Sequence, residues 1–256
     1  MEMNYSDYMQ YVSSILKEGK IRRSVQEART FGKFTKSEQG QWVPVNYAGY
    51  TCITPVPESK QENDTSFLIH KAQQELLRGL NPAKSVPAPA DALHMTIARL
   101  VSGDVFADGI MNKHEMKFIT AASRLFSHIS VAGPLQFTIK GMIVSEHGVI
   151  MAMVAPRSED DYLCLQSFRD DIYNDKVLSN FGVERKRSFK GHITLAYIEE
   201  ELTAGEKDRL AELIIDINKR YFLESVPYPI IRAEVRKFRN FLRFYRGDYW
   251  PAYHFA

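Results

Sequence analysis

Two short segments of the chain are near copies of each other and restrict how it can fold. They read His94-Met95-Thr96-Ile97-Ala98 and His192-Ile193-Thr194-Leu195-Ala196. Both are apolar enough to form strands, and side chains alternate along a strand. Each histidine therefore shares a face with the threonine two positions later, while the residue between them points to the opposite face. A repeat of this kind predicts two equivalent lobes that each present a His-x-Thr pair to a shared cleft.

The hydrophobic periodicity places the two segments in matching contexts. Helical spacing predicts helices over 6–18, 65–79, 113–128, 159–179 and 205–222. Strands are expected over 45–54, 92–100, 135–145, 148–155, 191–198, 229–237 and 241–246. The order strand, helix, His strand, helix, strand thus occurs twice. We expect an α+β fold with bilobed, duplicated β-α-β-α-β lobes, two antiparallel sheets lining a central cleft, and helices outside.

The length and composition favour one bilobed domain. The chain has 256 residues, 45% of them hydrophobic and 25% charged, which is enough for a sizeable core. We expect an N-terminal extension over 1–41 and a bilobed domain over 42–256, with the exchange between lobes near 135–155. No apolar run is long enough for a membrane span, and the first ten residues do not resemble a signal peptide. With two cysteines in apolar surroundings, a cytoplasmic protein is expected.

The repeated residues suit acid–base chemistry at phosphorus. One imidazole can deprotonate an attacking water while a second, protonated imidazole donates to the leaving oxygen. A threonine hydroxyl two residues on can donate to a non-bridging phosphate oxygen. His94, Thr96, His192 and Thr194 are therefore the candidate catalytic residues. No histidine or cysteine spacing typical of a metal site occurs, so we expect neither a metal nor a cofactor.

The two segments resemble those of the two-histidine (2H) phosphoesterase superfamily, which includes the LigT-type RNA ligase/cyclic phosphodiesterases. The family pattern of a hydrophobic residue on each side of the threonine is met by Met95-Thr96-Ile97 and Ile193-Thr194-Leu195. The resemblance covers about residues 42–247 in element order. It implies a bilobed fold, metal-independent phosphodiester chemistry and the same four catalytic residues. The chain departs from compact members in its N-terminal extension and in a loop after the first motif.

Fewer signals indicate which other residues contact a substrate. Lys190 shares the face of His192 by alternation, so it could reach a phosphate or simply face solvent. Tyr50 lies on the strand that we pair with the first His strand, where it could stack on a base or belong to the core. By the same alternation, Arg99 and Tyr197 fall on the face opposite to the histidines. Basic residues gather near the second lobe, at Arg185-Lys186-Arg187 and at Arg232, Arg236, Arg239, Arg243 and Arg246.

The expected activity is hydrolysis of a cyclic phosphodiester, either a 2′,3′-cyclic nucleotide or an RNA end, which would place the protein in RNA processing. An RNA-end ligase or 3′-exonuclease of the same fold is one alternative. A protein that binds a nucleotide without turnover is another, and a structural duplication with buried histidines is a third. The expected partner is a small cyclic nucleotide or an RNA end, without a membrane, and we expect a monomer. The net charge of +2 does not by itself indicate nucleic acid.

Overall fold

The computed structural model describes residues 2–56, 65–111 and 114–255. Its helices are α1 (Tyr5–Ile15), α2 (Glu18–Glu27), α3 (Thr65–Gly79), η1 (Ala90–Ala92), α4 (Asp104–Gly109), α5 (Glu115–Phe126), α6 (Glu159–Asn174), α7 (Lys176–Ser179) and α8 (Ala204–Tyr221). Its strands are β1 (Phe34–Lys36), β2 (Trp42–Pro44), β3 (Gly49–Pro55), β4 (Ser85–Pro87), β5 (His94–Ser102), β6 (Leu135–Val144), β7 (Val149–Pro156), β8 (His192–Ile198), β9 (Val226–Ile230), β10 (Arg232–Asn240), β11 (Arg243–Tyr245) and β12 (Ala252–His254).

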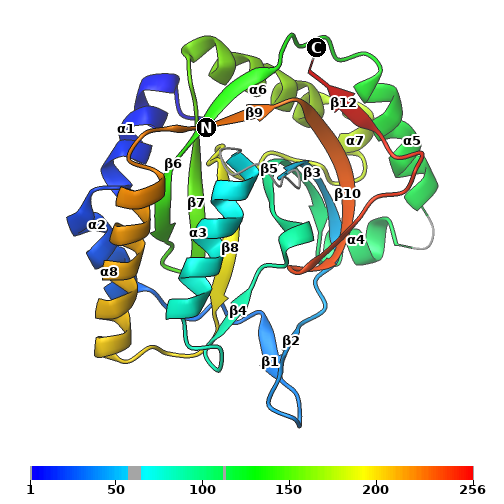
Figure 1. The fold of residues 1–256 in the computed structure, drawn as a ribbon. Helices are drawn as coiled ribbons and strands as arrows, with labels where there is room; N and C mark the ends of the chain where they lie inside the picture. Colours follow the sequence, from blue (N-terminus) through cyan, green and yellow to red (C-terminus); the bar gives the residue numbers. More distant parts are fainter. Residues whose placement is uncertain (1, 57–64, 112–113, 256) are drawn as a thin grey trace.

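One curled antiparallel sheet carries both His strands (Figure 1). Its order is β11-β10-β3-β5-β8-β7-β6-β9, with β12 beside β10 and β4 beside β8. The two central strands, β5 and β8, are joined by a single residue pair, Met95 with Ile193, because β4 occupies the edge of β8 beyond that point. The two expected antiparallel sheets are therefore the halves of one sheet, and the predicted α+β fold class is confirmed.

The closing strands are exchanged between the halves of the sheet. β6 follows the first set of helices but pairs with β7 and β9 in the second half. The chain returns to the first half at Ile231, after which β10 pairs with β3. The predicted strand over 229–237 is thus divided between β9 and β10, while the predicted hairpin with β11 is present.

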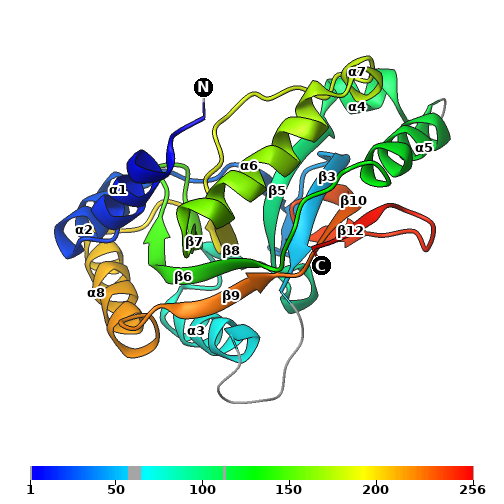
Figure 2. The same ribbon diagram turned by 90° about the horizontal axis from the view of Figure 1, so that it is seen from above.

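Helices flank the sheet on both sides. Figure 2 shows α6 above the sheet, and α3 and α8 on its other side. The helices α6 and α8 begin directly after capping residues. Ser158 and Thr203 each form a capping box with an acidic residue three positions later. The predicted helix over 159–179 ends at Asn174, and a short second helix follows because Asp175 adopts an extended backbone and caps α7. None of the described helices is long and apolar enough to cross a membrane.

The region predicted to be an extension contributes to the core. Tyr8 and Val12 of α1 and Ile21 and Val25 of α2 are buried in the same hydrophobic cluster as the sheet. The sequence did not predict α2, because Ile21 and Val25 are its only strongly apolar side chains. They lie four positions apart, on one face, and burial against the core stabilises the helix.

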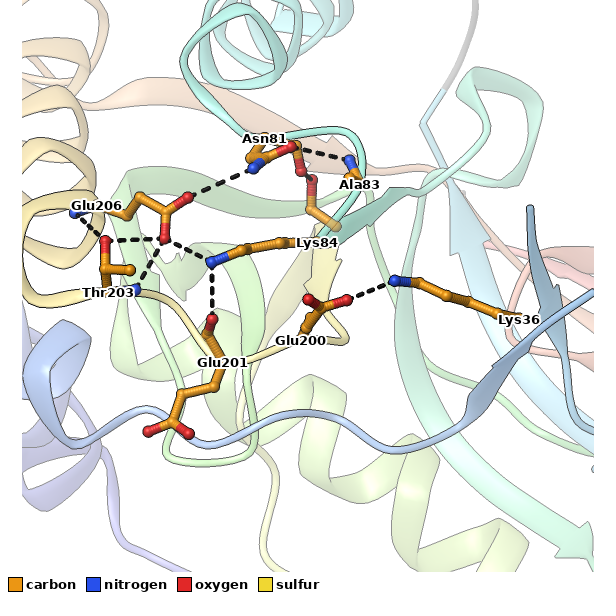
Figure 3. A network of polar contacts seen from close by, with 9 residues as sticks. Lys36, Asn81, Ala83, Lys84, Glu200, Glu201, Thr203 and Glu206 are labelled. Carbon is orange, nitrogen blue, oxygen red and sulfur yellow. Dashed lines mark hydrogen bonds and ion pairs between the residues drawn. The ribbon is translucent and has the colours of Figure 1, made fainter. Parts of the chain in front are cut away.

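A polar network fixes the chain where it leaves β8 (Figure 3). The Lys84 ammonium group donates to the Glu201 carbonyl at 3.0 Å and to the Glu206 carboxylate at 2.8 Å. The ion pair with Lys84 holds the pKa of Glu206 at about 2. Lys36 of β1 pairs with Glu200 in the same network. The loop before β4, the start of α8 and the β1–β2 hairpin are therefore held together at one end of the second His strand.

Candidate active site

The pairing of β5 with β8 brings the four candidate catalytic side chains onto one face. Met95 lies opposite Ile193 in an antiparallel register. Extending this antiparallel register by one residue in each direction sets His94 opposite Thr194 and Thr96 opposite His192. Paired residues share a face of the sheet, so all four side chains project away from Met95 and Ile193. All four are only partly buried. A His–Thr pair therefore lies on each side of the junction.

Both imidazole rings are oriented by the same backbone contact. The Nδ1 atom of His94 lies 2.7 Å from the Ala92 carbonyl oxygen, and that of His192 lies 2.7 Å from the Lys190 carbonyl oxygen. A carbonyl oxygen can only accept a hydrogen bond, so Nδ1 carries the proton in each ring. In the neutral rings this leaves Nε2 as the basic nitrogen.

Burial favours the neutral form of both histidines. It lowers the pKa of His94 to about 4, and the nearby charges of His192 and Arg236 act in the same direction. Burial also lowers the pKa of His192, with a contribution from the charge of Arg99. In each case the backbone carbonyl opposes the shift. Both rings are therefore neutral at pH 7 when no anion is bound.

The two His strands share an irregularity that the sequence does not reveal. In β5, Ile53 pairs with Thr96 and Cys52 with Ala98, so Ile97 is an extra residue. In β8, Met151 pairs with Thr194 and Ile150 with Ala196, so Leu195 is an extra residue. Each of these β-bulges comes three positions after its histidine. The repeat thus extends to the backbone geometry.

The bulges correct the predicted orientation of Arg99 and Tyr197. Thr51 and Ile53 share a face of β3, and their partners are Arg99 and Thr96. Arg99 therefore lies on the histidine face, because the extra residue shifts the alternation by one. The same argument through β7 puts Tyr197 on the face of Thr194.

The two equivalent positions differ in their surroundings. Tyr197 is 6% exposed and stacks on Phe31, with ring centroids 4.7 Å apart. Arg99 is exposed, and no carboxylate of the described residues pairs with it or with Arg187. Partial burial lowers the pKa of Arg99, and the charge of Arg187 lowers it further. The charge of Arg99, which acts on His192, and that of Arg187, which acts on Arg99, together favour an anion at this end of the site.

The structure contradicts the predicted role of Tyr50 and gives the Lys190 ammonium group an aromatic contact. Tyr50 is the neighbour of Thr51 along β3, so it lies on the face opposite to the histidines. It is 1% exposed and donates to Glu115, so it cannot stack on a base. The Lys190 ammonium group lies 4.6 Å from the ring centroid of Tyr11 in α1. The contact of Lys190 with His192 is made by its backbone carbonyl.

An aromatic and basic hairpin borders His94. The ring centroid of Phe244 in β11 lies 4.3 Å from that of His94. The ring centroid of Phe238 lies on from there, 5.8 Å from that of Phe244. Residues 236–246 contain five cations and no acidic residue. Three of the cations are paired with Glu234 or Glu115, but no described carboxylate pairs with Arg239 or Arg243. The hairpin therefore offers both a half-exposed ring and unpaired positive charge.

Other features of the surface lie away from the histidine pair. A hollow of about 360 Å³ is lined by α3 residues, and another of about 350 Å³ lies between α2 and the start of α8. Neither is lined by His94 or His192. Within the described ranges, no group of three or more His, Cys, Asp or Glu side chains could hold a metal ion.

No protein-family model and no curated protein matches the sequence. The similar solved structures include a conserved protein of unknown function, ATU0111 from Agrobacterium tumefaciens, with a TM-score of 0.62, 15% identity and coverage of 82% of this chain and 87% of that chain. E. coli LigT complexed with 3′-AMP has a TM-score of 0.46 and 14% identity, covering 78% and 94% respectively. The protein TT0787 of Thermus thermophilus has a TM-score of 0.44 and 15% identity, covering 73% and 86%. The likeness to the Agrobacterium protein concerns the fold alone. The two-histidine family stays a resemblance that the repeated segments carry.

Proposed function

We propose that the protein hydrolyses a cyclic phosphodiester, a 2′,3′-cyclic nucleotide or RNA end, without a catalytic metal. The observation that supports the proposal is the β5–β8 junction, where Met95 lies opposite Ile193 and the His-x-Thr residues around this pair share one face of the sheet. Two imidazoles on either side of one phosphorus atom suit in-line displacement. The threonine hydroxyl groups would donate to the non-bridging oxygens as negative charge increases there.

In the proposed reaction His94 is the general base. Its pKa of about 4 keeps Nε2 free of a proton at neutral pH. Nε2 removes a proton from water, the water oxygen forms a bond to phosphorus, and the bond from phosphorus to the leaving ribose oxygen breaks. His192 donates its proton to that oxygen, having been protonated when the anionic phosphate bound and raised its pKa. Exchange of protons with solvent then restores both rings.

The surroundings of the pair support a nucleotide substrate. Arg99 and Arg187 supply positive charge on the His192 side, where a phosphate would be bound. Phe244 lies beside His94, where its half-exposed ring can stack on a base. The unpaired cations Arg239 and Arg243 favour a substrate with further phosphates. This last feature is the reason to retain an RNA-end ligase or 3′-exonuclease as the second candidate.

Turnover of a 2′,3′-cyclic mononucleotide by His94→Ala and His192→Ala tests the proposal. Each variant should lose a factor of at least about 10² in kcat. His147→Ala is the matched control, because His147 lies in an exposed turn with 71% of its side chain accessible. Chelators should have no effect. Full activity in either active-site variant, or activity lost on chelation, would refute the mechanism. Binding without product would favour a nucleotide-binding protein, and product only from oligonucleotides would favour the second candidate.

A further inference from the structure

The segment that leads into His192 is held by residues near the start of the chain. Residues 183–191 form neither helix nor strand. Three consecutive residues of this segment are nevertheless contacted from 2–11. The Phe189 N–H donates to the Glu2 carboxylate at 2.7 Å, the Lys190 ammonium group lies over the Tyr11 ring, and the Gly191 N–H donates to the Tyr8 hydroxyl at 3.0 Å.

The Tyr8 hydroxyl makes the central contact. Besides accepting from Gly191, it donates to the Val154 carbonyl of β7 at 2.6 Å. The side chain is fully buried, and burial raises its pKa, so the phenol stays neutral and keeps both roles. It therefore ties the segment to β7. Gly191 permits this close approach, since a Cβ atom there would lie 2.6 Å from the Val154 carbonyl oxygen.

The equivalent position before His94 is held differently. There the carbonyl that accepts from Nδ1 belongs to Ala92, the last residue of the 3₁₀ turn η1. The turn is closed by its own bonds, from the Ala92 N–H to Pro89 and from the Leu93 N–H to Ala90. Residues 183–191, all of them described, contain no such turn before His192. The Lys190 carbonyl that accepts from His192 lies between Phe189 and Gly191, the two residues whose N–H groups are held by Glu2 and Tyr8.

We propose that residues 2–11, chiefly through the Tyr8 hydroxyl, are a positioning element for His192. They hold the Lys190 carbonyl where it receives the Nδ1 proton of the ring, and so direct Nε2 toward the substrate. The kinetic consequence rests on the proposed function, whereas the orientation of the ring does not. Tyr8 is a positioning residue, because it acts through the 189–191 segment.

Tyr8→Phe tests the inference, because it removes the hydroxyl and keeps the buried ring. We expect kcat to fall about 10- to 100-fold while KM is unchanged, as for a displaced catalytic group. Long-range ¹⁵N–¹H spectra should show His192 changing from the Nδ1–H tautomer to a mixture, with His94 unaffected. The matched control is Tyr253→Phe. The Tyr253 side chain is partly buried, and its hydroxyl also accepts from one backbone N–H and donates to one carbonyl, but both belong to Val131, outside residues 2–11.

The spectra separate failure of this inference from failure of the proposed function. In a folded Tyr8→Phe protein, an unchanged His192 tautomer would overturn the inference, whatever the activity. An equal change in Tyr253→Phe would also overturn it, since that result would reflect a general effect of removing a hydrogen-bonded hydroxyl. If the wild-type protein turns over no cyclic phosphodiester, the proposed function fails, and the tautomer measurement still decides the role of Tyr8.

Discussion

Arg99→Gln is the most informative perturbation of the candidate site. The substitution removes the guanidinium charge and retains a polar, though shorter, side chain. Arg99 is on the histidine face only because of the bulge at Ile97, and it has no carboxylate partner among the described residues. Its loss therefore leaves no buried acid unpaired. The effect on activity should come from the substrate contact alone.

The magnitude follows from the type of contact. A hydrogen bond between a guanidinium group and a phosphate contributes about 1.5–3 kcal/mol. Because Arg99 is exposed and Arg187 can supply part of the charge, we expect the lower end, about 1.5 kcal/mol. That corresponds to roughly a tenfold loss in kcat/KM. The free energy of unfolding should change by less than about 0.5 kcal/mol, because no folded-state ion pair is lost.

The assay combines kinetics with a titration of His192. The charge of Arg99 lowers the pKa of His192 in the wild-type protein, so the pKa measured by NMR should rise in the variant. The wild-type loss of kcat/KM on adding salt should be larger than that of the variant. Arg124→Gln on the exposed side of α5 is the control. Unchanged kcat/KM together with an unchanged pKa of His192 would refute the placement of Arg99 at the site.

Three further outcomes are expected. Because the pKa of His94 is lowered to about 4, the unfolded chain takes up this proton first, so the unfolding free energy should fall between pH 6.5 and 4. In denaturant titrations, the unfolding free energy of the His94→Asn variant should fall less over this pH range than that of the wild-type protein. The same pH dependence in both proteins would contradict the lowered pKa of His94. Thr96→Val should lower kcat about 100-fold with little change in stability, if its hydroxyl stabilises the transition state; an unchanged kcat would exclude that role. Gly191→Ala should destabilise by about 1–3 kcal/mol in chemical denaturation, because its Cβ would lie 2.6 Å from Val154. Gly205→Ala is the control, because a Cβ atom there would have no neighbouring atom closer than 3.6 Å. Equal unfolding free energies for the Gly191→Ala and Gly205→Ala variants would contradict the steric argument.

Local patterns predicted most of the secondary structure. The helix expected over 65–79 has the bounds of α3, and the strands expected over 135–145 and 148–155 correspond to β6 and β7. These predictions agree with the structure because hydrophobic periodicity is a property of residues close together in the sequence. The helix α2 was missed for the opposite reason, since its stability depends on burying Ile21 and Val25 against distant residues.

The sequence by itself determined the fold class, through its hydrophobic periodicity, and the repeated His-x-Thr segments indicated four side chains that could act together. Alternation along a strand is a property of the local backbone, so sequence was enough to set His94 with Thr96 and His192 with Thr194. Only the tertiary structure decided what surrounds them. Pairing with neighbouring strands created the two bulges that turn Arg99 and Tyr197 to the histidine face and leave Tyr50 on the other. Contacts across more than 180 residues brought Tyr8 to Gly191. Register and long-range packing depend on the partner strand, which local sequence does not encode.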